Sequence, residues 1–218
     1  MKKFCFELNG ATREKNAIIQ SVRYLGSDYV YSKKALPDHI PIGTIEYCES
    51  ILPKDYLKKP IDFFPEFLKD YRHREINYGF LEKIEKPLFL KNANCWKSNF
   101  ESKVYTPDEK IIPDFYYYSE PVKFEQEWRY YITQGTIISA GWYSGNNENE
   151  KAPHLDKIKF PIDFDAAVDF GRLSTGQIAI VESHAPFACG WYGDISFEYA
   201  MWQLEAWEGF LKKLDLHK

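Results

Sequence analysis

Two acidic residues and a histidine near the end of the chain have the spacing of a metal site. Asp169 lies in the apolar run AAVDF, Glu182 ends the apolar run IAIVE, and His184 follows two residues later. Glycine, serine and threonine between the two runs are typical of a turn, so residues 165–186 are predicted to form a β-hairpin. On paired strands Asp169 and Glu182 can face the same way, with Cβ atoms roughly 5 to 8 Å apart.

Two carboxylates at that separation repel each other unless a cation lies between them. Alternation along the second strand predicts that Ile180, Glu182 and His184 share one face. A hard divalent ion such as Mg²⁺, carrying a substrate phosphate, would relieve the repulsion. The alternative interpretation is an ordinary hairpin whose acids point at water, and the hairpin alone leaves both interpretations open.

A second candidate group lies in the aromatic-rich stretch 115–143. The β-rich runs EWRYYI and TIISAGWY meet at Gln134 and Gly135, which predicts another hairpin. Along its first strand Glu127 and Arg129 share a face. They form either a cross-strand salt bridge or a site in which the planar guanidinium of Arg129 contacts a phosphate or a developing negative charge.

Lysines provide the third candidate group. Lys91 ends the apolar run PLFLK, and the polar stretch after it carries Lys97 and Lys103. A lysine fixed at the end of a buried strand can hold one phosphate of a nucleotide while a loop closes over the others. The stretch does not resemble a Walker A sequence and the N-terminal part has no GxGxxG, so a solvated loop is the alternative.

The elements that would position these residues are a mixture of helices and strands, so we predict an α/β (α+β) fold. Residues 3–32 read as strand, helix and strand, a βαβ unit on a parallel sheet, and residues 1–58 are expected to form a small α/β lobe. The segment 60–86 is helical in pattern with a break at Pro65, and residues 144–162 predict a polar loop. An amphipathic helix is expected over residues 196–215.

The composition argues against several classes of protein. A net charge of −4 is unlike a general nucleic-acid binder, although Lys69 to Arg74 form a local basic stretch. The four cysteines stand far apart without metal-ligand spacing, so we interpret them as buried small hydrophobic residues. No signal peptide and no run near the ~18 apolar residues of a membrane span is visible, so a cytoplasmic protein is predicted.

Together, these residues resemble the ATP-grasp superfamily and, more narrowly, the R2K clade of small ATP-grasp proteins of phage and bacterial genomes. Glu120 and Glu127 stand seven residues apart, as do the hinge and ribose-binding acids of that superfamily. Asp169, Glu182 and position 184 follow its D-x12-E-x-N pattern of metal ligands. The stretch PIGTIEY at 41–47, a helix carrying Arg72 and Arg74, and the late GWYG are also similar to the clade.

The resemblance implies a role for each candidate residue. Lys91, with Lys97 or Lys103, would contact the phosphates of ATP, and Arg129 and Lys97 are expected to act in catalysis. The backbone of Glu120, Val122 and Lys123 would hold the adenine, and Glu127 would bind the ribose. The implied ligands of Mg²⁺ are Asp169, Glu182 and His184. His184 stands where the family usually has Asn, and because imidazole is a poorer Mg²⁺ ligand than an amide oxygen, contact with phosphate or substrate is the alternative.

The resemblance also implies an ATP-grasp fold with a pre-ATP-grasp lobe at 1–58 and an ATP-grasp domain at 59–218, whose two α+β lobes enclose the nucleotide. The implied activity is that of a Mg²⁺-dependent, ATP-dependent carboxylate–amine ligase that works through an acyl phosphate. Its substrates would be small-molecule or peptide carboxylates and amines, with tRNA as the one nucleic acid that stays open. The alternative function is a nucleotide-binding protein that senses or sequesters a nucleotide without ligase chemistry.

Overall fold

The N-terminal segment folds as the βαβ unit that its sequence predicts. The computed structural model describes residues 3–10, 12–95 and 100–214. Its first elements are β1 (Lys3–Glu7), α1 (Thr12–Ser21), β2 (Asp28–Ser32) and β3 (His39–Ile42). β1 lies between β2 and β3 and pairs with both in parallel. Phe4, Cys5 and Phe6 of this central strand are fully buried, which makes it the core of the N-terminal sheet.

Two short helices, α2 (Ile45–Glu49) and α3 (Lys54–Leu57), connect the N-terminal sheet to the rest of the chain. Thr44 is the N-cap of α2, since its Oγ1 accepts a hydrogen bond of 3.3 Å from the backbone N–H of Tyr47. Glu7 accepts a further bond of 2.7 Å from the Thr44 backbone N–H. The start of α2 is therefore fixed by its own cap and by the end of β1.

A second sheet corrects one prediction. The segment 60–86, expected to be helical, holds only the short 3-10 helix η1 (Glu66–Tyr71) and then a strand, β4. The antiparallel sheet has the order β4-β7-β5-β6, formed by β4 (Ile76–Leu81), β5 (Leu88–Asn92), β6 (Lys103–Tyr105) and β7 (Asp114–Ser119). Tyr78 of β4 stacks on Phe115 of β7 with ring centroids 5.7 Å apart, so cross-strand aromatic packing overrides the helical pattern.

The third sheet contains both predicted hairpins. Its order is β11-β10-β8-β9, formed by β8 (Phe124–Thr133), β9 (Thr136–Gly145), β10 (Ala166–Leu173) and β11 (Ile178–His184). The turn between β8 and β9 has positive φ angles at Gln134 (49°) and Gly135 (69°), which matches the type I′ turn favoured by two-residue hairpins. Residues 146–165 connect β9 to β10 without a regular element.

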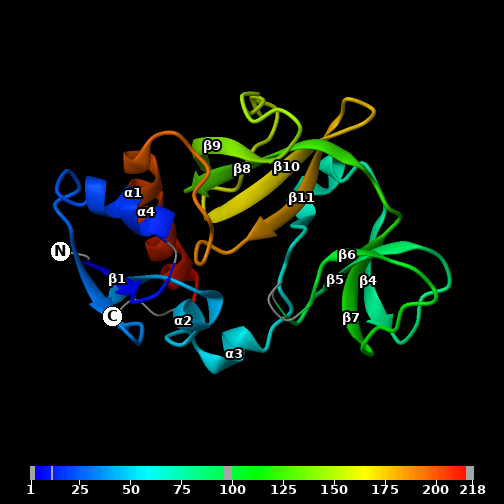
Figure 1. Cartoon of the computed structure of the whole chain (residues 1–218), viewed down its shortest axis with the longest axis horizontal. Coiled ribbons are helices and arrows are strands. Elements are labelled where there is room, and N and C mark those ends of the chain that lie inside the picture. The colour runs from blue at the N-terminus through cyan, green and yellow to red at the C-terminus, as the bar shows by residue number, and fades with distance from the viewer. Residues whose placement is uncertain (1–2, 11, 96–99, 215–218) are drawn as a thin grey trace.

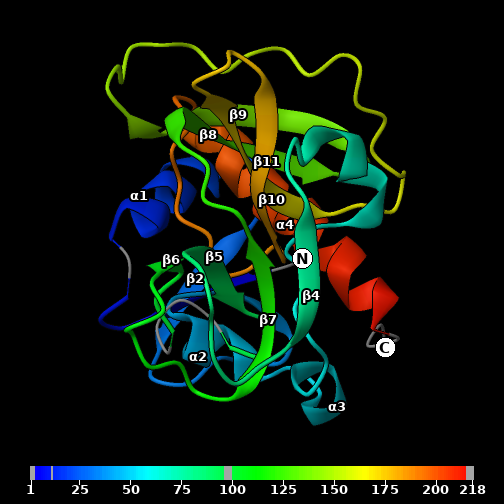
Figure 2. The ribbon, with the colours of Figure 1, turned by 90° about the vertical axis from the view of Figure 1, so that its right-hand side faces the viewer.

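The C-terminal helix α4 (Ser196–Lys213) joins the N-terminal sheet to the third sheet. It lies between α1 and the β8–β11 sheet in Figure 1, and Figure 2 shows it behind β10 and β11. Trp202 donates from Nε1 to the backbone carbonyl of Ile132 at 2.9 Å, and one core contains Trp202, Tyr131 and Phe4. Neither α4 nor any other described helix has the length and apolar character needed to cross a bilayer.

Candidate functional site

A bulge in β11 gives the β10–β11 hairpin one polar and one apolar face. Asp169 pairs directly with Glu182, but the next residue, Phe170, pairs with Ile180, so Val181 is left over between them. Because directly opposed residues share a face, Ile180 lies with Phe170 on the apolar face and Glu182 lies with Asp169 on the other. The prediction that Ile180 and Glu182 share a face was therefore wrong, while the predicted pairing of Asp169 with Glu182 is confirmed.

Asp169 is held by Arg129 of the neighbouring strand. The two residues are directly opposed in the β8–β10 ladder. Arg129 donates from Nε and from Nη2 to the two carboxylate oxygens, each at 2.7 Å. Asp169 is fully buried and Arg129 is 6% exposed. This two-bond geometry matches the fork of a guanidinium to a carboxylate in a site closed to water.

Glu182 is held by a residue from the other sheet. The ammonium group of Lys91, on β5, forms a short ion pair with Oε2 of Glu182, and Nε2 of His184 donates to Oε1 at 2.7 Å. Lys91 is buried, and its Nζ lies 4.0 Å from the centre of the Phe63 ring. The Lys91–Glu182 pair therefore links the second sheet to the third.

The charges of this cluster stabilise one another. Burial alone would raise the pKa of both acids, but Arg129 and His184 hold the pKa of Asp169 below its usual value, and His184 and Lys91 hold that of Glu182 well below. Burial opposes the charged form of His184, yet Glu182 and Asp169 outweigh it and raise its pKa. Both carboxylates are therefore ionised at neutral pH and each has a cationic partner.

The same three residues fit a divalent cation. One ligand atom from each of Asp169, Glu182 and His184 lies within 4.8 Å of the other two. The carboxylate oxygens suit Mg²⁺, whereas an imidazole is more typical of transition metals. Arg129, Lys91 and His184 already bond all four carboxylate oxygens, so a cation would share these oxygens with their present donors or replace one of them.

Two tyrosines complete the surroundings of Arg129. Its Cζ lies 4.9 Å from the centre of the Tyr143 ring and 5.4 Å from that of Tyr192. Tyr192 is held in place because its backbone N–H donates to the hydroxyl of Tyr131 at 2.9 Å. At Gly141, opposite Arg129 on β9, an added Cβ would lie 1.9 Å from the carbonyl oxygen of Tyr192. A glycine is therefore required where residues 191–193 cross the strand.

A strap formed by residues 61–64 ties the two antiparallel sheets together beside the cluster. The N–H of Ile61 donates to the carbonyl of Ala93, just after β5, at 2.7 Å. Two residues on, the carbonyl of Phe63 accepts from the N–H of Ser183 of β11 at 2.9 Å. Sequence analysis missed this strap, because the aromatic pair in DFFP was read as part of a helix.

The other predicted lysines and acids lie at different places. Lys103 is on β6 and not in a loop, and it pairs in register with Leu90, the neighbour of Lys91. Its ammonium group forms ion pairs with Glu109 (3.0 Å) and Glu101 (3.7 Å). Lys103 therefore shares the face of Leu90, opposite that of Lys91. Lys97 lies outside the described residues.

The predicted nucleotide contacts follow β7. Glu120 is exposed and pairs with Lys86 at 2.7 Å, and residues 120–123 form an irregular connector into β8. The carbonyl of Lys123 accepts from the N–H of Ser174, which ties the connector to the β10–β11 turn, while Val122 is half-buried. Glu127 lies two residues before Arg129 on β8 and shares its face. Contacts of Glu120, Val122, Lys123 and Glu127 with a nucleotide stay predictions.

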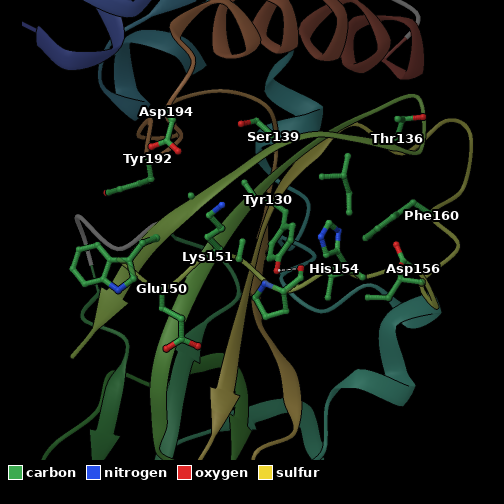
Figure 3. A pocket seen from close by; sticks show the side chains of 18 of the residues that line it. Tyr130, Thr136, Ser139, Glu150, Lys151, His154, Asp156, Phe160, Tyr192 and Asp194 are labelled. Carbon is green, nitrogen blue, oxygen red and sulfur yellow. Dashed lines mark hydrogen bonds between the residues drawn. The ribbon is translucent and has the colours of Figure 1, made fainter. Parts of the chain in front are cut away.

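A large cavity lies elsewhere in the described part of the chain (Figure 3). Its volume is about 1280 Å³, and it runs between β9 and the segment 148–156. In Figure 3 the Tyr130 hydroxyl reaches this segment, where it donates to the carbonyl of Pro153 at 2.7 Å. Of the residues around Arg129 described above, Tyr192 and Gly141 line it, so this cavity and the charged cluster share one wall.

Comparison with known families assigns most of the chain to one of them. Residues 71–201 match the model of the "ATP-grasp domain, R2K clade family 2". This match covers more than half of the chain, and the chain belongs to this family of ATP-grasp domains. A search of curated proteins finds no significant match.

Solved structures with the same fold include several ligases. A RimK domain ATP-grasp protein from Sphaerobacter thermophilus DSM 20745 superposes with a TM-score of 0.53 at 12% identity, covering 93% of this chain and 99% of the other. N5-carboxyaminoimidazole synthetase from Staphylococcus aureus superposes with a TM-score of 0.55 at 9% identity, covering 94% of this chain and 77% of the other. D-alanine–D-alanine ligase from Bacillus anthracis complexed with ATP superposes with a TM-score of 0.51 at 11% identity, covering 99% of each chain. At these identities the similarity establishes the ATP-grasp fold.

Proposed function

We propose that this protein is an ATP-dependent carboxylate–amine ligase whose catalytic centre is the charged cluster of Lys91, Arg129, Asp169, Glu182 and His184. The observation that carries the proposal is the convergence of these five residues from strands of two different sheets into one site with little exposure to water. A site of this kind supplies fixed charges, which are the main requirement of phosphoryl transfer.

The proposed reaction has two steps. A carboxylate oxygen attacks the γ-phosphorus of ATP, the bond to the bridging oxygen breaks, and ADP leaves from the acyl phosphate. An amine nitrogen then attacks the carbonyl carbon, inorganic phosphate leaves with its electron pair, and the nitrogen loses a proton to give the amide. The substrates would be small-molecule or peptide carboxylates and amines, and the reaction would take place in the cytoplasm.

The chain's own residues would act as follows. Lys91 would exchange Glu182 for a phosphate, since its ammonium is buried at the junction of the two sheets, 4.0 Å from the centre of the Phe63 ring. Arg129 stays charged, because Asp169 raises its pKa well above the usual value despite burial, and it would steady the transferred phosphoryl group. Asp169 holds the guanidinium in orientation.

The site also suits a Mg²⁺ ion held by Glu182 and Asp169, with His184 beside it. Such an ion would neutralise phosphate charge and polarise the phosphoryl oxygens. Residues 120–123 and Glu127 are proposed to hold the adenine and ribose, and Lys103 and Lys97 stay candidates for contact with the phosphates.

A glutamate-to-glutamine substitution tests this proposal. In Glu182→Gln the amide oxygen can still accept from Lys91, so the fold should persist, while Mg²⁺-dependent ADP release should fall about 100-fold or more. Release would be measured with ATP, Mg²⁺ and panels of amino acids, dipeptides and amines. Glu85→Gln is the matched control, because Glu85 is exposed and pairs only with Lys83 among the described residues. Equal turnover in Glu182→Gln and wild type would refute the metal assignment.

One observation favours a second candidate function. Both carboxylates already have cationic partners, so the cluster is electrically balanced without a metal ion. A nucleotide-binding protein without ligase chemistry is consistent with this balance. Tight ATP binding with no ADP release in any acid and amine mixture would favour that function, and ADP release that depends on an added amine would exclude it.

A further inference from the structure

A second cavity opens on the charged cluster from the side of the strap. Its volume is about 590 Å³, within the range of about 300–1000 Å³ typical of sites for small ligands. It is bounded by the start of the strap, by α3 and α4, and by the end of β11. His184 and Ser183 line it, so His184 belongs both to this cavity and to the proposed catalytic centre. A molecule in the cavity would present one end to the cluster.

The walls of the cavity are mainly aromatic and aliphatic. On one side Phe67 meets Phe164 edge to face with centroids 4.9 Å apart, and on another side Tyr56 meets Phe210 at 5.3 Å. Ile61 and Pro186 add further apolar surface. Walls of this kind bind rings or branched aliphatic groups through the area that they bury.

The charges of the lining favour a cation. It contains four carboxylates, of Glu49, Asp62, Glu66 and Asp165, and two ammonium groups, of Lys59 and Lys213. Part of this charge is compensated on both sides, since Lys213 lies 3.9 Å from Asp163 and Glu66 lies 3.1 Å from Arg72. The opposite side of His184 has the buried cations Lys91 and Arg129, which suit the anionic partner of the reaction. On that side each cation already has a carboxylate partner, so the side of His184 with an excess of carboxylates is the cavity.

Asp62 is the carboxylate best suited to receive an ammonium group. It lies on the strap, one residue before Phe63, and accepts a hydrogen bond of 3.2 Å from the backbone N–H of Phe64. Burial raises its pKa, and Glu66 adds to the effect, against the opposing contributions of the Phe64 N–H and Arg72. A carboxylate in such a position gains from a cationic partner.

We propose that this cavity binds the amine substrate, and that this substrate is an amine with an aromatic or branched aliphatic group. The apolar group lies between the Phe67–Phe164 and Tyr56–Phe210 pairs. Asp62 receives the ammonium group, which releases a proton to water before the neutral amine attacks the acyl phosphate at the His184 end. The assignment of the substrate role rests on the proposed ligase function, whereas the binding preference can be measured without it.

Ligand-observed NMR with a charge-reversed pair of probes tests the inference. Saturation-transfer titrations of the full chain would use 2-phenylethylamine and 3-phenylpropanoate, which have similar rings and opposite charges, and ethylamine, which lacks the ring. 2-Phenylethylamine should bind at least about fivefold more tightly than either other probe. Asp62→Asn should raise its Kd about tenfold, and Phe67→Ala should raise it severalfold. Asp70→Asn, on the same segment but outside the lining, should leave it unchanged.

Three results would overturn the inference: equal or tighter binding of 3-phenylpropanoate, no saturation of 2-phenylethylamine at millimolar concentration, or a Kd unaffected by both Asp62→Asn and Phe67→Ala. Failure of the ligase proposal is a separate result. Wild-type protein that binds this amine but never releases ADP would contradict ligase chemistry and support the amine preference of the cavity.

Discussion

Asp169 and Glu182 are directly opposed on β10 and β11, yet a different cation neutralises each of them. Asp169 is fully buried with Arg129 in the same sheet, whereas Glu182 is partly exposed and reaches Lys91 of another sheet. The first pair is suited to hold a guanidinium in place. The second pair can separate when a nucleotide brings phosphates to Lys91.

Asp169→Asn should consequently destabilise the protein. The substitution leaves the buried guanidinium of Arg129 without a charged partner, and breaking a buried pair in this way costs about 3–5 kcal/mol. Urea unfolding followed by circular dichroism measures the loss, with Glu182→Gln as the comparison. An unfolding free energy within 1 kcal/mol of wild type, on the order of one ordinary surface substitution, would contradict the structural role of the pair.

The thiols allow an independent check of burial. Burial raises the pKa of both Cys48 and Cys189 to about 12, and both side chains are buried. At pH 8 only about 0.01% of each would be thiolate, the reactive form. Native protein should therefore react slowly at both positions with a thiol reagent, while protein in guanidinium chloride should react at all four cysteines at once.

The same thiols give a dependence of stability on pH. Because their folded pKa values exceed the unfolded value of about 8.5, the unfolded state releases these protons first as the pH rises. The free energy of unfolding should thus be unaffected by them below about pH 8 and should fall between about pH 8.5 and 12. In the labelling experiment, peptide mapping identifies which cysteines have reacted with the thiol reagent. Immediate reaction of Cys48 and Cys189 in the native protein would show that these thiols are accessible.

At the scale of elements, the crossing of residues 191–193 over β9 depends on one glycine. Gly141→Ala would bring a Cβ into the carbonyl of Tyr192, so the crossing segment must shift and the Tyr192 contacts with Tyr131 and Arg129 weaken. We expect a loss of about 1–3 kcal/mol in unfolding free energy. Gly79→Ala on β4 is the control, since its nearest neighbour would be a Tyr118 ring atom at 3.7 Å. Equal effects of the two substitutions would contradict the close crossing.

The sequence predicts best those helices and strands that are marked by residues close together in the chain. The βαβ unit, both hairpins and α4 are marked by periodicity and turn residues, and the structure confirms them. The strand β4 was missed because its partner, β7, lies over 30 residues away and pairs through aromatic contacts. The bulge at Val181 was also missed, since a one-residue shift in register is determined by packing of Ile180 against Phe170 and not by local sequence.

The same distinction applies to the site. Residue types and spacing brought Asp169 and Glu182 together correctly, because a hairpin is local. The pairing of Arg129 with Asp169, of Lys91 with Glu182, and the position of Tyr192 depend on how distant strands are arranged. Sequence reasoning therefore found charged members of the cluster but not which of them bond.

For the whole molecule, the central observation is that the Lys91–Glu182 pair joins the two antiparallel sheets. Beside it the strap bonds to Ala93 on one side and to Ser183 on the other. The N-terminal sheet and α4, which lie to the left of the third sheet in Figure 1, share a core that also contains Tyr131 and Ala167 of the third sheet. The division into residues 1–58 and 59–218 stays a proposal. Nucleotide binding should act mainly on the junction between the two sheets.

The central claim is that Lys91 leaves Glu182 for a phosphate while Glu182 binds Mg²⁺. Calorimetric titration with a non-hydrolysable ATP analogue, with and without Mg²⁺, tests it in wild type and in Glu182→Gln. We predict that Mg²⁺ tightens binding to wild type by about tenfold or more and to Glu182→Gln by less than about twofold, with both proteins folded. An equal effect of Mg²⁺ on the two proteins, or no binding of the analogue to wild type, would contradict the account.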